Sequence, residues 1–108
     1  MNDRALRINA DNFEEKVLKA DKPVLVDFYS DTCIPCKQMA GILGDIEDEN
    51  EDNIYIYKVN VNYDNDLAAK YKVMSAPTVI AFVNGEQKGK VVGLKEPEDI
   101  EALFEEYI

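Results

Sequence analysis

The fold is decided by residues 24–36, which read VLVDFYSDTCIPC. The first six, residues 24–29, form a nearly continuous run of apolar, β-branched and aromatic side chains, typical of a central parallel strand covered on both faces. Cys33 and Cys36 follow at once, and they are the only two cysteines in the chain. Residues from about 35 to 49 place apolar side chains on one helical face. The cysteine pair therefore stands where a strand gives way to a helix.

The spacing of the two cysteines points to a dithiol that switches redox state. On the first turn of a helix, two thiols at this spacing can close a small disulfide, and the helix amides and macrodipole stabilise the thiolate of the first one. A loop this small restricts the unfolded chain very little, so stabilisation is a weak reason for the bond. Pro35 suits the first turn because its missing amide would have no intrahelical partner. A pair of buried structural thiols is the alternative.

Further strands and helices are predicted on both sides of this stretch. Apolar patterning predicts strands at residues 5–8, 54–61, 77–83 and 88–92, and helices at residues 13–18, 65–71 and 97–107. Asn84-Gly85 indicates a tight hairpin, so the last two strands should be antiparallel. The last helix is expected to bury Ile100, Leu103, Phe104 and Tyr107. The element order predicts a three-layer α/β/α sandwich with a mixed central sheet of about five strands and four helices.

Composition restricts the class of protein. The 108 residues are 46% hydrophobic, which predicts one compact domain spanning residues 1–108. The start of the chain, residues 1–4, lacks the basic and apolar features of a secretory signal, and no apolar segment reaches the roughly 20 residues needed to cross a bilayer. We therefore expect a soluble, cytoplasmic protein that does not act at a membrane. A net charge of -10 repels phosphate backbones and argues against nucleic acid as a partner.

Acidic residues gather where the helix after the dithiol should end, at Asp45, Glu47, Asp48, Glu49, Glu51 and Asp52. The macrodipole disfavours anions at a helix C-terminus, so this cluster is interpreted as a solvated helix end. An acidic surface presented to a basic partner protein is the alternative.

A metal site is the main chemical rival to a redox dithiol. In a reducing cytosol, a Cys-x-x-Cys pair is more often catalytic or metal-binding than a permanent disulfide. The chain has no histidine and no third cysteine, whereas structural zinc sites seldom lack these residues at their remaining positions. We therefore expect neither a bound metal nor a cofactor.

The order of these features resembles the thioredoxin family. The dithiol is preceded by Asp27 within a buried strand and followed by the segment SAPT at residues 75–78 and by the Asn84-Gly85 hairpin. The family active site reads Trp-Cys-Gly-Pro-Cys-Lys, so here Thr32 replaces the tryptophan and Ile34 the glycine. The resemblance covers almost the whole chain and implies the thioredoxin fold.

The resemblance also implies a role for each catalytic residue. Cys33 should be the attacking thiolate, with a pKa lowered toward about 7, and Cys36 the resolving thiol. Asp27 lies in an apolar strand, where burial raises the pKa of a carboxyl group, and in the family the matching aspartate takes the proton of the resolving cysteine. A half-buried structural acid is the alternative. Lys58 matches the family lysine beside this aspartate, and the alternative is a strand lysine that points outward.

A second segment is implied to contact the substrate. In the family, a loop that ends in a cis proline faces the dithiol and pairs with an extended substrate segment, which implies a cis bond between Ala76 and Pro77. An ordinary strand-opening proline is the alternative. Gly93 matches a glycine that lets substrate approach, unless it is only a strand-end glycine. The expected substrate-contacting residues are Thr32, Ile34, Pro35, Ser75, Ala76, Pro77 and Gly93.

The implied function is reduction of disulfides in cytosolic target proteins by a monomeric thiol-disulfide oxidoreductase. The implied electron source is thioredoxin reductase, a flavoprotein linked to NADPH or to ferredoxin. One alternative is a dedicated electron donor to one enzyme system, for which Thr32 and Ile34 would reshape the docking surface. Another is a thioredoxin-fold binding subunit whose dithiol is incidental. An oxidase or isomerase is disfavoured because it usually needs a more oxidising couple and compartment.

Overall fold

The computed structural model describes residues 5–108. Within this range a mixed sheet has the strand order β1-β3-β2-β4-β5. Its strands are β1 (Leu6–Arg7), β2 (Val24–Tyr29), β3 (Tyr55–Asn60), β4 (Thr78–Val83) and β5 (Glu86–Val92). β1, β3 and β2 run parallel to one another, whereas β4 is antiparallel to β2 and β5 is antiparallel to β4.

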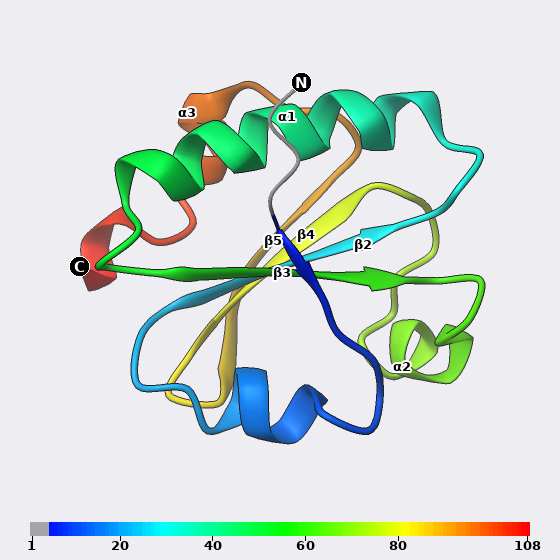
Figure 1. Cartoon of the computed structure of the whole chain (residues 1–108), viewed down its shortest axis with the longest axis horizontal. Coiled ribbons are helices and arrows are strands. Elements are labelled where there is room, and N and C mark those ends of the chain that lie inside the picture. Colours follow the sequence, from blue (N-terminus) through cyan, green and yellow to red (C-terminus); the bar gives the residue numbers. More distant parts are fainter. Residues whose placement is uncertain (1–4) are drawn as a thin grey trace.

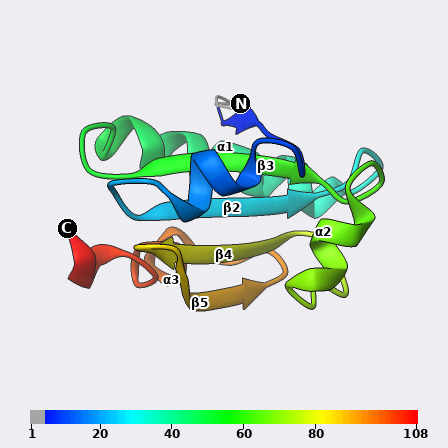
Figure 2. The same ribbon diagram turned by 90° about the horizontal axis from the view of Figure 1, so that it is seen from below.

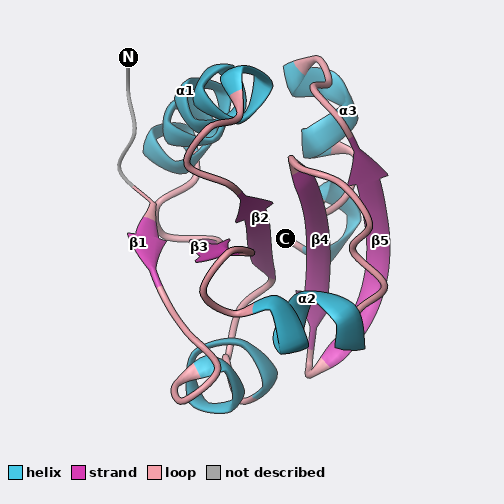
Figure 3. Ribbon diagram, turned by 90° about the vertical axis from the view of Figure 1, so that its right-hand side faces the viewer, coloured by secondary structure: helices cyan, strands magenta, loops and turns pink. Residues whose placement is uncertain are grey.

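Helices cover both faces of this sheet (Figures 1 and 3). They are α1 (Ile34–Glu49) and α3 (Pro97–Glu101) on one face, and η1 (Glu14–Leu18) and α2 (Asn65–Lys70) on the other. A short 3₁₀ helix, η2 (Glu105–Tyr107), follows α3. The predicted three-layer α/β/α sandwich is therefore confirmed for the described residues, while the first four residues of the predicted domain lie outside them.

The alternation of side chains along β2 divides the core in two. Val24, Val26 and Phe28 pack with η1 and α2, in a cluster that includes Phe13 and Leu67. Leu25 points the other way and packs with α1 and α3, in a cluster that includes Met39, Leu43 and Ile100. Because side chains alternate along a strand, Asp27 shares the face of Leu25 and lies under α1. α1, which carries Cys36 in its first turn, covers this face of the sheet.

Several strand boundaries differ from the predictions. β5 begins at Glu86 rather than at residue 88, because Asn84 and Gly85 alone make the turn, with φ angles of 53° and 80°. Positive φ at both positions is the geometry of a two-residue type I′ hairpin, which leaves the next residue free to pair. The first strand, predicted at residues 5–8, and the third, predicted at 54–61, are also shorter at their ends than predicted.

The predicted last helix is in fact interrupted. α3 ends at Glu101, and the amides of Leu103 and Phe104 bond to carbonyls only three residues back, at 3.0 and 3.1 Å. These tighter turns change which side chains face the sheet. Ile100 and Phe104 are buried and Leu103 packs at the edge of the core, but Tyr107, predicted to be buried, is 37% exposed.

Candidate active site

The two cysteines lie at the junction of β2 and α1. β2 ends at Tyr29, and Cys33 is the N-cap residue of α1, with an extended backbone (φ -95°, ψ 111°). Cys33 and Cys36 are joined by a disulfide, and their Cα atoms are 5.2 Å apart. Figure 2 shows this junction at the same end of the sheet as the segment that leads into β4. The strand-to-helix placement predicted for the pair is therefore confirmed.

The sulfur of Cys33 occupies the place of a helix cap. The backbone amide of Cys36 donates a hydrogen bond to Cys33 Sγ over 3.1 Å. No acidic side chain lies in the first turn of α1, and Pro35 occupies that turn without an orphan amide. An anion at this position is favoured by the amide and by the dipole of a helix 16 residues long. A negative charge on Cys33 Sγ would therefore be stabilised at this position.

The two sulfur-bearing residues differ in accessibility. Cys33 is partly exposed, whereas Cys36 is only 4% exposed and lies in the first turn of α1. An incoming disulfide can reach Cys33 but not Cys36. This difference favours Cys33 as the group that meets another molecule.

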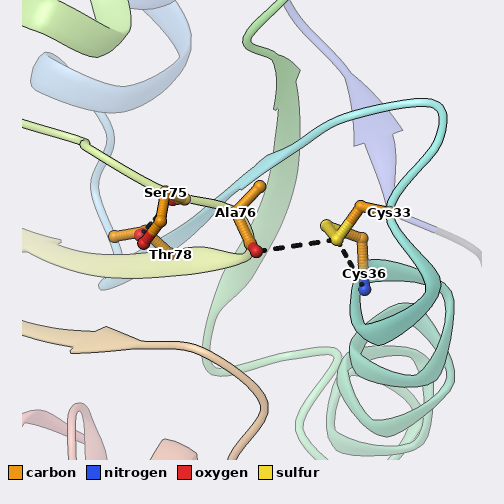
Figure 4. Close-up of a disulfide and its surroundings, with 5 residues drawn as sticks. All are labelled: Cys33, Cys36, Ser75, Ala76 and Thr78. Carbon is orange, nitrogen blue, oxygen red and sulfur yellow. Dashed lines mark hydrogen bonds between the residues drawn. A yellow bond between two sulfur atoms is a disulfide. The ribbon is translucent and has the colours of Figure 1, made fainter.

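The loop before β4 faces the disulfide (Figure 4). The carbonyl oxygen of Ala76 lies 3.6 Å from Cys33 Sγ, and the peptide bond between Ala76 and Pro77 is cis, as predicted. Two hydrogen bonds fix this loop: Thr78 Oγ1 donates to Ser75 O at 2.8 Å, and the amide of Gly93 donates to Pro77 O at 2.7 Å. The structure therefore brings the predicted substrate-contacting loop to the sulfur of Cys33.

The rim of the dithiol is partly apolar. Among the predicted substrate-contacting residues, Thr32, Ile34, Pro35 and Ser75 are exposed, Ala76 and Gly93 are half-buried, and Pro77 is buried. Ile34 is 70% exposed, and Met74, which the sequence reasoning did not single out, is 92% exposed. The one signal for Met74 was an apolar residue within a loop, two positions before Ala76. Large apolar side chains in this position suit contact with another protein.

A cavity of about 180 Å³ lies behind the dithiol. It is lined by Asp27, Tyr29, Ser30, Asp31, Cys36, Lys37, Ala40 and Lys58. Asp27 is 3% exposed and pairs in register with Lys58 on the neighbouring strand β3. Lys58 Nζ lies 5.5 Å from the centre of the Tyr29 ring. The structure thus brings Asp27, Lys58 and Cys36 to the walls of one cavity.

Sequence reasoning missed a buried amide beside this site. Asn60, the last residue of β3, is 1% exposed, and its Nδ2 donates to Asp31 Oδ1 over 3.0 Å. Its Oδ1 accepts a hydrogen bond from the amide of Asn62 at 2.9 Å. The one available signal was a polar residue that continues the inward-facing positions of an apolar strand.

The described residues, 5–108, contain no group of three or more histidine, cysteine or acidic residues arranged to hold a metal ion. Their helices include none with the length and apolar character needed to span a bilayer.

Comparison with known proteins identifies relatives over most of the chain. The family model described as Thioredoxin matches residues 4–106. The chain is 41% identical to a thioredoxin of Rickettsia bellii over 90 residues, which cover 83% of this chain and 86% of that protein. It is 39% identical to a thioredoxin of Acidithiobacillus ferridurans over 93 residues, 86% of each chain. A chloroplastic M-type thioredoxin of Pisum sativum is 36% identical over 101 residues, 94% of this chain and 59% of that protein.

Proposed function

Because this chain belongs to the thioredoxin family, we propose that it reduces disulfide bonds in other proteins, with Cys33 as the attacking thiolate and Cys36 as the resolving thiol. The chain is a thiol-disulfide oxidoreductase of this family and exchanges disulfides through its Cys-x-x-Cys pair. One observation carries the assignment of roles. The sulfur of Cys33, a partly exposed residue, caps α1 and accepts a hydrogen bond from the amide of Cys36 at 3.1 Å, where a negative charge is favoured.

The reaction proceeds by two exchanges. The Cys33 thiolate attacks one sulfur of the target disulfide, the target S–S bond breaks, and the other target sulfur leaves as a thiolate. The product is a mixed disulfide between Cys33 and the target. The Cys36 thiolate then attacks the sulfur of Cys33, which releases the second target thiol and closes the Cys33–Cys36 disulfide. The target gains two electrons, and the dithiol loses two.

The second exchange needs the proton of Cys36 to be removed. Asp27 is the proposed acceptor, because it lies under α1 and lines the same cavity as Cys36. Lys58 is proposed to favour the ionised form of this carboxyl group from the neighbouring strand. The cavity volume of about 180 Å³ supports this role, because it has room for water between the carboxyl group and the sulfur.

The target is proposed to bind across the dithiol rim. Its chain would lie along residues 75–77, where the Ala76 carbonyl is already 3.6 Å from Cys33 Sγ. Thr32, Ile34 and Pro35 would form the other side of the contact, and Gly93 would leave room for the target backbone. Gly93 supports this reading because a Cβ atom built on it meets nothing within 4 Å.

Regeneration of the dithiol needs an electron donor. We assign this role to a flavoprotein thioredoxin reductase, linked either to NADPH or to ferredoxin, and place the cycle in the cytoplasm. A compartment that keeps thiols reduced suits a protein whose product is a reduced target.

Trapping the mixed disulfide tests the assignment of the two cysteines. Cys36→Ser should accumulate covalent complexes with disulfide-containing targets through Cys33, and thiol reductants should release them. Cys33→Ser is the matched control, since it keeps one sulfur in the same turn and should form no such complex. A Cys36→Ser protein that turns over insulin at the parent rate would refute the assignment.

A dedicated electron donor is the second candidate, and the exposed Ile34 and Met74 favour it. Ile34 is next to Cys33 in the chain, and Met74 lies two positions before Ala76, whose carbonyl oxygen is 3.6 Å from Cys33 Sγ. Two large apolar side chains in these segments would restrict which partners can approach. A panel of unrelated disulfide proteins separates the two candidates. Turnover of most of the panel supports the general reductase, whereas turnover of a single member supports the dedicated donor.

A further inference from the structure

The side chain of Asn60 joins two loops at the dithiol end of the molecule. Asn60 and Asp31 are 29 positions apart in the chain, yet Asn60 Nδ2 donates to Asp31 Oδ1 over 3.0 Å. The other end of the same carboxamide accepts the amide of Asn62 at 2.9 Å. With an exposure of 1%, this group has almost no access to solvent hydrogen bonds. Both contacts therefore replace water that the buried amide has lost.

The position of Asp31 gives this contact its significance. Asp31 lies in the loop between β2 and α1, two residues before Cys33, and is one of the residues that line the same cavity as Cys36. The last residue of β3 is thus hydrogen-bonded to the loop that leads into Cys33. The sulfur of Cys33 exchanges its covalent partner during the proposed reaction. The strand side of the link is fixed by the register of β3 with β2, which extends to the pairing of Asn60 with Tyr29.

We propose that Asn60 is a positioning residue for the dithiol, acting through Asp31 on the loop that carries Cys33. In the oxidised protein the disulfide itself restrains this loop. When the bond opens, the hydrogen bond to Asp31 keeps the loop in place, so that the sulfur of Cys33 stays at the N-terminus of α1. The link therefore stabilises the reduced dithiol more than the disulfide.

The redox equilibrium with glutathione measures this difference directly. Reduced protein and glutathione disulfide yield oxidised protein and two molecules of glutathione, so the equilibrium constant compares the two states without any target protein. Its outcome is thus separate from the test of the proposed reductase function, because a protein with no natural target would still show it.

Asp31→Ala removes the hydrogen bond between Asn60 and Asp31 by changing its exposed partner, so the variant should fold. We expect its equilibrium constant to shift about tenfold toward the disulfide, which is about 30 mV for a two-electron couple. Asp31→Asn removes the charge but keeps an oxygen that can accept the hydrogen bond of Asn60. Its shift should be less than threefold, which separates the link from the charge.

The reciprocal exchange supplies the stronger test. Asn60→Asp sets two carboxyl groups against each other and should shift the equilibrium at least as far as Asp31→Ala. Adding Asp31→Asn to it restores a donor facing an acceptor and should return the constant to within about threefold of the parent. Asp64→Ala is the matched control, since it removes a side-chain hydrogen bond to the amide of Ala10, 3.1 Å long, from the neighbouring loop without touching the dithiol loop.

A purely structural role for Asn60 predicts a different pattern. In that case Asp31→Ala lowers the free energy of unfolding while the equilibrium with glutathione stays within twofold of the parent. That result, or a double variant that shifts as far as Asn60→Asp alone, would overturn the proposal. Unfolding by urea should be measured on the same samples in both redox states.

Discussion

Asp27 and Lys58 lie side by side in the parallel register of β2 and β3, and both line the cavity that reaches Cys36. The alternation of β2 turns Asp27 toward α1, while the pairing of the two strands fixes which β3 residue lies next to it. The carboxyl group, the ammonium group and the buried sulfur are therefore placed by three different elements.

Asp27→Asn should slow the second exchange and spare the first. The amide has the shape of the carboxyl group but cannot accept the proton of Cys36, so release of the target from the mixed disulfide should slow by about 100-fold. The attack of Cys33 on a disulfide should stay within about threefold of the parent. Rapid mixing with a disulfide probe, read as formation and then loss of the mixed disulfide, separates the two steps. Equal slowing of both steps would contradict the role of Asp27.

Lys58→Met should change the pH dependence of the same step. Without the neighbouring ammonium group, the ionised form of Asp27 is less favoured, so its pKa should rise and release should reach half of its maximum rate at a higher pH. The measurement is the rate of release across the pH range, with Lys37→Met as the control, because Lys37 lines the same cavity from α1 rather than from the strand beside Asp27. If the pH dependence of the release rate is unchanged, Lys58 does not influence the ionisation of Asp27.

The parts of this fold that local pattern decides were predictable from the sequence. β2 has the predicted bounds, because an uninterrupted apolar run fits a strand buried on both faces. α1 was placed to within one residue, since its apolar face and Pro35 agree. The spacing of the cysteines at the strand-to-helix junction indicated the disulfide that the structure contains.

The parts that depend on contacts between distant residues were not predictable in this way. No local pattern links Asn60 to Asp31, and none reveals that Met74 would be 92% exposed. The break after Glu101 also escaped prediction, because the helical spacing of Ile100 and Phe104 continues across it. Their burial was right, but the turns between them tighten and leave Tyr107 at the surface.

Alkaline pH should destabilise the protein through two tyrosines. Burial raises the pKa of Tyr57 and of Tyr71 above the ordinary value of 10.0, and nearby Tyr55, Glu47 and Asp21 add to the effect on Tyr57. The folded protein thus keeps phenol protons that the unfolded chain loses. This contribution to stability is complete below the unfolded pKa and is lost as the pH rises through the folded pKa. The free energy of unfolding should therefore fall above about pH 10.

Tyrosine-to-phenylalanine variants check the source of this loss. Tyr57→Phe and Tyr71→Phe should each flatten the decline in urea stability between about pH 9 and pH 11. Tyr63→Phe, at a side chain 70% exposed, is the control and should leave the decline unchanged. The chain has no tryptophan, so the ultraviolet absorbance of tyrosinate can be followed without interference. An unchanged slope in both test variants would rule out this source.

Alanine substitutions at Gly85 and Gly93, two glycines with positive φ, distinguish the cost of a strained backbone from the cost of steric overlap. Gly85 has φ 80° and Gly93 has φ 87°, so alanine is strained at either position. A Cβ atom on Gly85 would lie 2.8 Å from the carbonyl oxygen of Leu18, whereas one on Gly93 meets nothing within 4 Å. Gly93→Ala should lower the free energy of unfolding by about 1 kcal/mol, and Gly85→Ala by about 2–4 kcal/mol. Urea unfolding of both variants gives the comparison, and equal losses would mean that the end of η1 at Leu18 moves away without cost.

The C-terminus of α2 offers a substitution that should stabilise the fold. Lys72 has φ 58°, and the amides of Lys72 and Val73 bond back to Ala69 O at 3.0 Å and Ala68 O at 2.9 Å, the pattern of a Schellman cap. Glycine relieves the left-handed strain but adds freedom to the unfolded chain, so Lys72→Gly should raise the free energy of unfolding by about 0.5–1 kcal/mol. Lys70→Gly, two residues earlier inside the helix, should instead lower it by about 1 kcal/mol. Urea denaturation measures the free energy of unfolding of both variants. A loss of stability in both would mean that the backbone at Lys72 is not strained.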